Sequence, residues 1–335
     1  MKKRKCVLFL SLLICLLMLG GCGAQGSETI ENPLDYDSAM TTEENNQTEE
    51  PSEVNQQEMI QTADSRTFEY EIQELYASRD DNQIYGVIYI PQDAGEQLPT
   101  VIYAHGYGVT HQNGIQYAEK LAEHGFVVYC FDFCGGGNGS QSDGSPLEMS
   151  IFTEQSDLEA VIEMVKGLDY VDSENVFLFG ASQGGLVAGI TAAANPEEIQ
   201  GLILLYPGFE IIEDAQALFA TVDDIPETYS MFGWMTVGRT YFEDLLGYDV
   251  YGVIGAYEKD VLLIHGDADG IVPLSSSERA LEVYPSAELK VLPGADGILR
   301  CRPSENDAER NGRCICGIDG HSRNRRIFGA ASVYD

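Results

Sequence analysis

Basic residues are scarce in this sequence. It has 19 lysines and arginines against 54 aspartates and glutamates, which gives a formal net charge of −35 at pH 7. So acidic a balance argues against nucleic acid and anionic lipid surfaces as partners, and it fits a soluble, exported protein. The sequence also lacks C-x-x-C and H-E-x-x-H patterns. We therefore expect neither a metal site nor any other cofactor.

The N-terminus carries an apolar run that is shorter than a typical membrane-spanning helix. The basic segment MKKRK precedes the apolar residues Cys6 to Leu19, which is the order of a signal peptide. The next residues, Leu19-Gly20-Gly21-Cys22, resemble a bacterial lipobox. The resemblance implies a lipoprotein signal peptide at 1–21 and lipid attached to Cys22 at the outer face of a membrane. An ordinary signal peptide with an incidental cysteine is the alternative.

Lysine and arginine are absent from Gly23 to Ser65, which is rich in Glu, Gln, Asn, Ser and Thr. Such a segment cannot bury enough apolar surface to offset its ordering entropy. Residues 22–66 are therefore predicted to be a disordered acidic spacer. The remaining chain, about 270 residues, is long enough for one large α/β domain, which we place at 67–296.

Short apolar runs bounded by Gly, Pro and Asp recur through this domain. Runs of that length are typical of strands buried on both faces, and the helical patterns between them indicate a doubly wound, mostly parallel sheet. Two alternating segments ahead of them predict an antiparallel hairpin at a sheet edge. The hairpin is expected at 68–77 and 82–91, the buried strands at 100–104, 126–132, 176–180, 201–207, 261–264 and 289–292, and the helices at 114–124, 154–166, 182–194 and 274–283.

A serine stands where one of these strands meets a helix. The sequence Gly180-Ala181-Ser182-Gln183-Gly184 follows the apolar run VFLF and precedes a helix of small residues. In a G-x-S-x-G turn of this kind the serine is lifted out of the backbone, and the next N–H lies at the start of the helix. A serine hydroxyl needs a general base, and a third group that orients the base, to become a nucleophile. Ser182 is the candidate nucleophile.

Two other patterns follow strands in the order that such an enzyme requires. They are HGYG at 105–108 and HGDADGIVP at 265–273. With the serine turn, and with 131–144 as the loop after the fourth strand, they resemble the α/β-hydrolase family over 68–296. The spacing is most similar to cinnamoyl/feruloyl esterases and dienelactone-hydrolase-like enzymes. The resemblance implies the α/β-hydrolase fold, and it implies that His105 and His265 shape their turns rather than catalyse.

The resemblance also assigns roles around Ser182. The acid of the catalytic triad falls on Asp269, and the neighbouring Asp267 is the alternative. The backbone N–H groups of Gln183 and Tyr107 are expected to form the oxyanion hole.

The segment 208–259 is far longer than an ordinary connection between strands. In this family an insert at that place caps the active site. Its Met and aromatic residues, Phe232 and Trp234 among them, either pack against one another or line an acyl or aromatic pocket.

The triad histidine is missing from its usual place. The family carries Gly-Ala-x-His-Gly-Phe after its last strand, whereas this chain continues from Asp296 without a histidine. Residues 297–335 hold seven arginines and three cysteines, whereas 22–296 holds eight lysines and arginines in all. Read one base to the right with synonymous codons, the tail can spell GFYGADRA and then VDAFAELMG, an amphipathic closing helix. We interpret 297–335 as an out-of-frame tail; a natural tail that brings His321 into the site is the alternative.

The sequence therefore predicts an extracytoplasmic serine hydrolase that cleaves small carboxylic esters, impaired in this chain by the loss of its histidine. A serine peptidase or amidase on the same fold is one alternative, since a triad does not separate esters from amides. A non-catalytic surface-binding lipoprotein is another. The partners expected are the ester and the membrane reached through Cys22, but no nucleic acid; the oligomeric state is left open.

Overall fold

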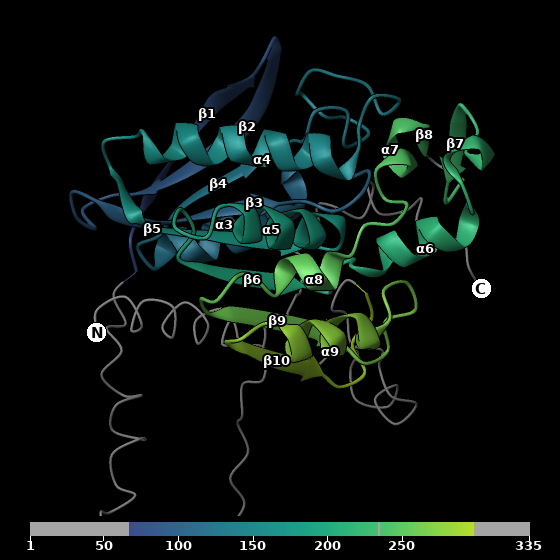
Figure 1. The fold of residues 1–335 in the computed structure, drawn as a ribbon. Coiled ribbons are helices and arrows are strands. Elements are labelled where there is room, and N and C mark those ends of the chain that lie inside the picture. Colours follow the sequence, from purple (N-terminus) through teal and green to yellow (C-terminus); the bar gives the residue numbers. More distant parts are fainter. Residues whose placement is uncertain (1–66, 234, 298–335) are drawn as a thin grey trace, which may run out of the picture. The chain divides into compact units, whose positions relative to one another are not determined.

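The computed structural model describes residues 67–233 and 235–297 (Figure 1). The predictions for the signal peptide, Cys22, the acidic spacer, Trp234 and the tail with His321 fall outside these residues. None of the helices in the described part is long and apolar enough to cross a membrane.

One large sheet organises the described residues. Its strand order is β1-β2-β4-β3-β5-β6-β9-β10. The expected edge hairpin is confirmed, because β1 pairs with β2 and β2 with β4 in antiparallel fashion, and the other pairs are parallel. The strands are β1 (Tyr70–Arg79), β2 (Asn82–Pro91), β3 (Leu98–Ala104), β4 (Val127–Phe131), β5 (Val171–Ala181), β6 (Gly201–Leu205), β9 (Val261–Gly266) and β10 (Ala287–Leu292).

The sheet has an apolar core on each face. Along β5, Val176 and Leu178 enter one core whereas Phe177 and Phe179 enter the other, as the alternation of side chains in a strand requires. The first core also contains residues of α4, α5, α8 and α9, and the second contains residues of α3. Helices on both faces explain why the central strands read as continuous apolar runs.

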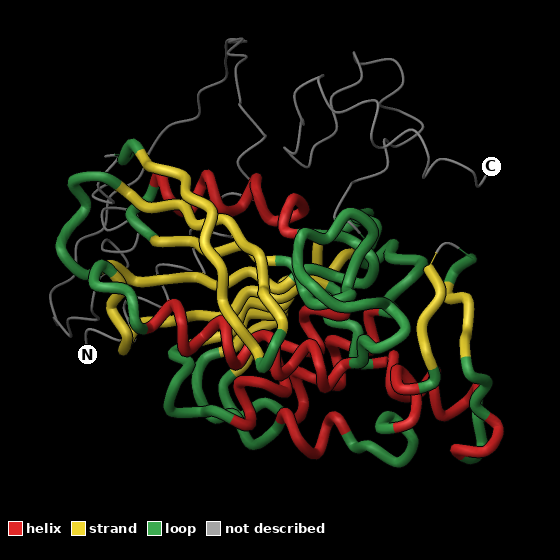
Figure 2. Tube along the Cα trace, turned by 90° about the horizontal axis from the view of Figure 1, so that it is seen from above, coloured by secondary structure: helices red, strands yellow, loops and turns green. Residues whose placement is uncertain are grey.

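Helices connect the parallel strands, and the long insert carries its own small elements. Figure 1 shows α6, α7, β7 and β8 of the insert gathered at one end of the sheet, and Figure 2 shows the β7–β8 hairpin apart from the main strands. The sequence pattern did not predict this hairpin. The helical elements are η2 (His111–Gly114), α3 (Ile115–Glu123), α4 (Ile151–Lys166), α5 (Gln183–Ala194), α6 (Glu210–Leu218), η3 (Val222–Asp224), α7 (Thr240–Glu243), α8 (Val250–Ile254) and α9 (Leu274–Val283), and the hairpin strands are β7 (Thr228–Met231) and β8 (Met235–Gly238).

The strand register brings the predicted catalytic turns together. Ala104 pairs with Gly180, and Ala181 pairs with Leu205. The carboxyl ends of β3, β5 and β6 therefore lie together at one end of the sheet. Ligands bind at this end in open α/β sheets.

Two glycines allow β5, α5 and β3 to meet this closely. An ideal Cβ on Gly180 would lie 2.3 Å from the Gly184 carbonyl oxygen, and one on Gly184 would lie 2.3 Å from the Ala104 carbonyl oxygen. Both contacts are with backbone, which cannot rotate away as a side chain can. The serine turn thus requires glycine at both positions.

We predict that Gly184→Ala lowers the free energy of unfolding by about 2 kcal/mol or more, because overpacking against backbone displaces β3 or α5. The matched control is Gly189→Ala in the same helix, where the nearest atoms are side-chain ring and hydroxyl atoms at 3.0 to 3.3 Å. That variant should stay within about 1 kcal/mol of the parent, since alanine also favours the helix. Urea unfolding followed by circular dichroism measures both, and equal losses would contradict this steric account.

Candidate catalytic site

Ser182 occupies the tip of the turn between β5 and α5 in a backbone conformation that is rare outside glycine. Its φ is 53° and its ψ is −123°. The Ser182 N–H donates to Leu205 O at 3.0 Å, and Ser182 O accepts from Gly185 N and Gly208 N, each at 2.9 Å. These bonds hold a conformation that costs on the order of 1–3 kcal/mol. Ser182 is partly exposed, at the carboxyl end of β5.

The HGYG turn packs directly against this serine. An ideal Cβ on Gly106 would lie 3.2 Å from Ser182 Cβ and 3.7 Å from its Oγ. Behind the turn, Gly108 N donates to Gly136 O at 2.9 Å, so the glycine-rich loop after β4 supports it. The peptide N–H of Tyr107 thus belongs to a turn that borders Ser182 on one side.

Gln183 directly follows the serine in the chain. It is the first residue of α5, and the first N–H groups of a helix have no carbonyl partner within the helix. The two amides predicted as oxyanion donors therefore belong to the two segments that adjoin Ser182, the HGYG turn and the first turn of α5.

Asp269 lies in the turn after β9, with its side chain fully buried. Its Oδ1 accepts from the N–H groups of Ile271 at 2.8 Å and Val272 at 3.0 Å. Burial opposes ionisation, but the contact with His265 and these two amides outweigh it and hold the pKa of Asp269 below its ordinary value. Asp269 is thus a fixed, charged acceptor.

The second oxygen of Asp269 is buried and has no hydrogen-bond partner within the described part of the chain. The Nε2 atom of His265 is 3.5 Å away and pairs instead with Val272 O at 3.0 Å. A buried carboxylate oxygen without a donor is costly, so one that persists calls for a functional explanation.

Gly297, the last described residue, lies against this carboxylate. An ideal Cβ at Gly297 would lie 2.5 Å from Asp269 Oδ1 and 2.8 Å from Oδ2. The alternative acid, Asp267, is exposed and accepts from Gly294 N at 2.6 Å. Of the two aspartates, it is Asp269 that is buried beside the chain segment after β10.

None of the histidines in the described segments is hydrogen-bonded to Ser182. His105 and His265 are fully buried. Their ring nitrogens form hydrogen bonds with backbone atoms or a serine hydroxyl, in keeping with roles in shaping turns. Burial also lowers the pKa of His105. The ring contacts are His105 with Gly106 O and Phe133 N, His111 with Asp132, His124 with Lys120 O, and His265 with Ser277 Oγ and Val272 O.

Two buried hydrogen bonds of the Gln183 side chain, one from Tyr241 of the insert's aromatic cluster and one to Glu154, were not foreseen. The Nε2 atom of Gln183 donates to Glu154 Oε2 at 2.9 Å, and the Tyr241 hydroxyl donates to Gln183 Oε1 at 2.6 Å. Burial raises the pKa of Glu154 well above its ordinary value. A signal for Glu154 was present, since it lies one turn from Ile151 and from Leu158 on the apolar face of α4.

Glu210 is a further unforeseen group, at the start of α6. Burial raises its pKa to about 7, and its Oε2 has no hydrogen-bond partner among the described residues. It lies in the segment that begins with Gly208, which is bonded to Ser182 O.

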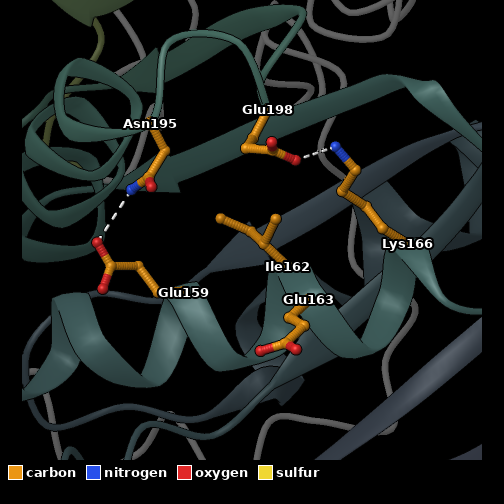
Figure 3. A pocket seen from close by; sticks show the side chains of 6 residues that line it. All are labelled: Glu159, Ile162, Glu163, Lys166, Asn195 and Glu198. Carbon is orange, nitrogen blue, oxygen red and sulfur yellow. Dashed lines mark hydrogen bonds and ion pairs between the residues drawn. The ribbon is translucent and has the colours of Figure 1, made fainter.

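A surface hollow of about 440 Å³ lies elsewhere, between α4 and the end of α5 (Figure 3). Asn195 donates to Glu159 at 2.9 Å and Lys166 pairs with Glu198, so four of its polar side chains are bonded within the hollow. None of its lining residues belongs to the catalytic turns, so we assign it no part in the chemistry at Ser182.

Known protein families place this site in context. Residues 95–236 match the family described as "Serine aminopeptidase, S33". Among curated proteins, YfhR of Escherichia coli O157:H7 is 25% identical over 209 residues, which span 61% of this chain and 65% of YfhR. YcjY of Escherichia coli K12 is 36% identical over 112 residues, which span 32% of this chain and 35% of YcjY. The match thus covers less than two thirds of these relatives' length.

Among solved structures, this chain is similar to Est1E from Butyrivibrio proteoclasticus with ferulic acid bound. The TM-score is 0.62 at 27% identity, and the alignment covers 67% of this chain and 91% of Est1E.

Proposed function

We propose that this chain, which has the α/β-hydrolase fold, hydrolyses carboxylic esters through an acyl-enzyme formed on Ser182. The observation that carries this proposal is the strained backbone of Ser182, between the Gly106 turn and the first turn of α5. Strain of this kind clusters at active sites, where the surrounding structure over-determines it. A hydroxyl so placed can attack a carbonyl carbon while the amides of Tyr107 and Gln183 receive the oxyanion.

The proposed reaction has two halves. Ser182 Oγ bonds to the acyl carbon as a base takes its proton, and collapse of the tetrahedral intermediate expels the alcohol, which recovers that proton from the base. Water then attacks the acyl carbon with the help of the same base, which releases the acid and restores the serine hydroxyl. Asp269 would orient the base and stabilise its charged form.

The base itself is the part that this chain lacks in its described residues. When the family pattern Gly-Ala-x-His is aligned on Gly294 and Ala295, its histidine falls at position 297. This chain has glycine there. The unused oxygen of Asp269 and the close approach of Gly297 support that assignment. We propose that the reading frame is lost after Asp296 and that the chain as written is impaired. His321, which lies beyond the described residues, is the alternative base.

An ester with an aromatic acyl group is the substrate class we favour. Tyr107 contacts the rings of Phe232 and Tyr241 from the insert, at centroid distances of 5.9 and 6.2 Å. Est1E, whose structure holds ferulic acid, supports the same choice. The family description "Serine aminopeptidase" favours a second candidate, cleavage of a peptide or aminoacyl amide. Parallel assays with a feruloyl ester and an aminoacyl anilide would separate the two.

We further propose that the enzyme works outside the cytoplasm, tethered through lipid on Cys22. The support is the sequence Leu19-Gly20-Gly21-Cys22 followed by the acidic segment up to Ser65.

For the anchor, we predict that the parent protein partitions into the detergent phase of a Triton X-114 extraction and that Cys22→Ala moves it to the aqueous phase. Acyl chains supply the affinity, at about 0.8 kcal/mol for each buried CH₂ group. If both proteins partition alike, lipid at Cys22 is ruled out.

For catalysis, we predict that a one-base correction near codon 296 raises hydrolysis of a simple aryl ester by several orders of magnitude. Loss of the histidine in a comparable hydrolase costs on the order of a millionfold in turnover. In the corrected chain, Ser182→Ala should abolish both hydrolysis and labelling by a fluorophosphonate.

The outcome that contradicts this proposal is specific. If the uncorrected chain hydrolyses the ester as fast as the corrected one, and His321→Ala inactivates it, then the tail supplies its own base. Retained fluorophosphonate labelling in Ser182→Ala would instead overturn the choice of nucleophile.

A further inference from the structure

Three buried polar side chains form a chain of hydrogen bonds behind the serine turn. They are Glu154 of α4, Gln183 at the start of α5 and Tyr241 of α7, and each is fully buried. Gln183 donates to Glu154 at 2.9 Å and accepts from Tyr241 at 2.6 Å. Both ends of the Gln183 amide are therefore used, which fixes the orientation of the side chain.

The insert that contains Tyr241 also contacts Tyr107, the other predicted oxyanion residue. The Tyr107 hydroxyl donates to Met235 O of β8 at 3.3 Å, and the Tyr107 ring contacts Tyr241 edge to face. The insert is thus bonded to the side chains of both residues whose backbone amides belong to the segments that adjoin Ser182.

The insert is seated firmly enough to transmit these contacts. An ideal Cβ on Gly238, at the end of β8, would lie 2.0 Å from Leu147 O, so the two backbones touch. The ring of Phe152 on α4 meets Tyr248 of the insert at 5.1 Å. Movement of the insert would have to break these contacts together with the bond from Tyr241.

We propose that Tyr241 is a positioning residue, which fixes the oxyanion hole through Gln183 and makes the insert a structural part of the catalytic centre. This inference rests on the proposed function, since the amides of Tyr107 and Gln183 serve as an oxyanion hole here only if Ser182 carries out acyl transfer. An oxyanion hole must hold its donors to within about 0.5 Å of the productive geometry. Freeing one end of the Gln183 amide releases a residue whose own backbone N–H is one of the two donors.

The test uses the full chain, with free imidazole supplied in place of the missing base, and two ring-matched probes. Phenylboronic acid bonds through boron to Ser182 Oγ, with the serine proton passing to solvent, and the tetrahedral adduct places a boron-bound oxygen in the oxyanion hole. Benzamide carries the same ring but stays trigonal and forms no covalent bond. Titration calorimetry measures both affinities, and ¹¹B NMR reports the tetrahedral boron.

We expect Tyr241→Phe, which removes only one hydroxyl, to weaken phenylboronic acid about tenfold and leave benzamide unchanged. The effect should be smaller than the 10²- to 10³-fold loss from removing an oxyanion donor outright, because the amide itself remains. The matched control is Tyr251→Phe, whose hydroxyl also donates to a buried backbone carbonyl, that of Ser276, away from Gln183. It should leave both affinities unchanged.

The opposite end of the same amide gives an independent check should Tyr241→Phe fail to fold. Glu154→Leu removes the acceptor of Gln183 Nε2 and should reproduce the selective loss. Glu154→Gln keeps an acceptor oxygen there and should restore the parent affinity.

The failures are distinguishable. If the parent forms a Ser182-dependent tetrahedral adduct but Tyr241→Phe binds phenylboronic acid as the parent does, or weakens both probes equally, the positioning role is wrong. If the parent forms no adduct that Ser182→Ala abolishes, the proposed function and this inference both fall.

Discussion

The site depends on one strained residue, because Ser182 can present its hydroxyl only while its φ stays near 53°. Such a conformation is unfavourable on its own by about 1–3 kcal/mol, so neighbouring structure must maintain it. Hydrogen bonds from Gly185 and Gly208 to Ser182 O tie the residue to α5 and to the insert, and its own N–H reaches β6. Gly184 lets the turn press onto β3. The same constraint that lifts the hydroxyl therefore also fixes the amide of Gln183 and the direction in which α5 leaves.

A second constraint is electrostatic. Asp269 is buried and charged, and its Oδ2 has no donor within the described chain. In a triad that oxygen would accept from an imidazole, which the acid orients and stabilises. The segment after β10 brings Gly297 onto the same carboxylate. The proposed acid therefore lacks the partner that a triad histidine would supply, which supports our proposal that the chain is an impaired hydrolase rather than a binding protein.

Local signals in the sequence predicted the elements well and the long-range contacts poorly. Helix α9 begins and ends where its apolar pattern predicted, whereas α4 begins at Ile151 rather than Glu154 because Ser150 and Thr153 form a capping box. The short β7–β8 hairpin gave too few residues for an alternating pattern. Glu154 could be recognised as a polar residue on an apolar helix face, but its partners could not, since Tyr241 reaches Gln183 only after the insert folds back on the turn. The proximity of position 297 to Asp269 likewise could not be predicted from the sequence, because it depends on how the chain folds after β10.

We propose that a general base is the one group missing from the catalytic centre around Ser182. The direct measurement is hydrolysis of a nitrophenyl ester by the chain as written, with increasing free imidazole and with Ser182→Ala as the background. Our account predicts a Ser182-dependent rate that rises with imidazole to saturation, and a much smaller rise in Asp269→Asn, which cannot stabilise the imidazolium. A rate that does not respond to imidazole, or that responds equally without Asp269, would contradict it.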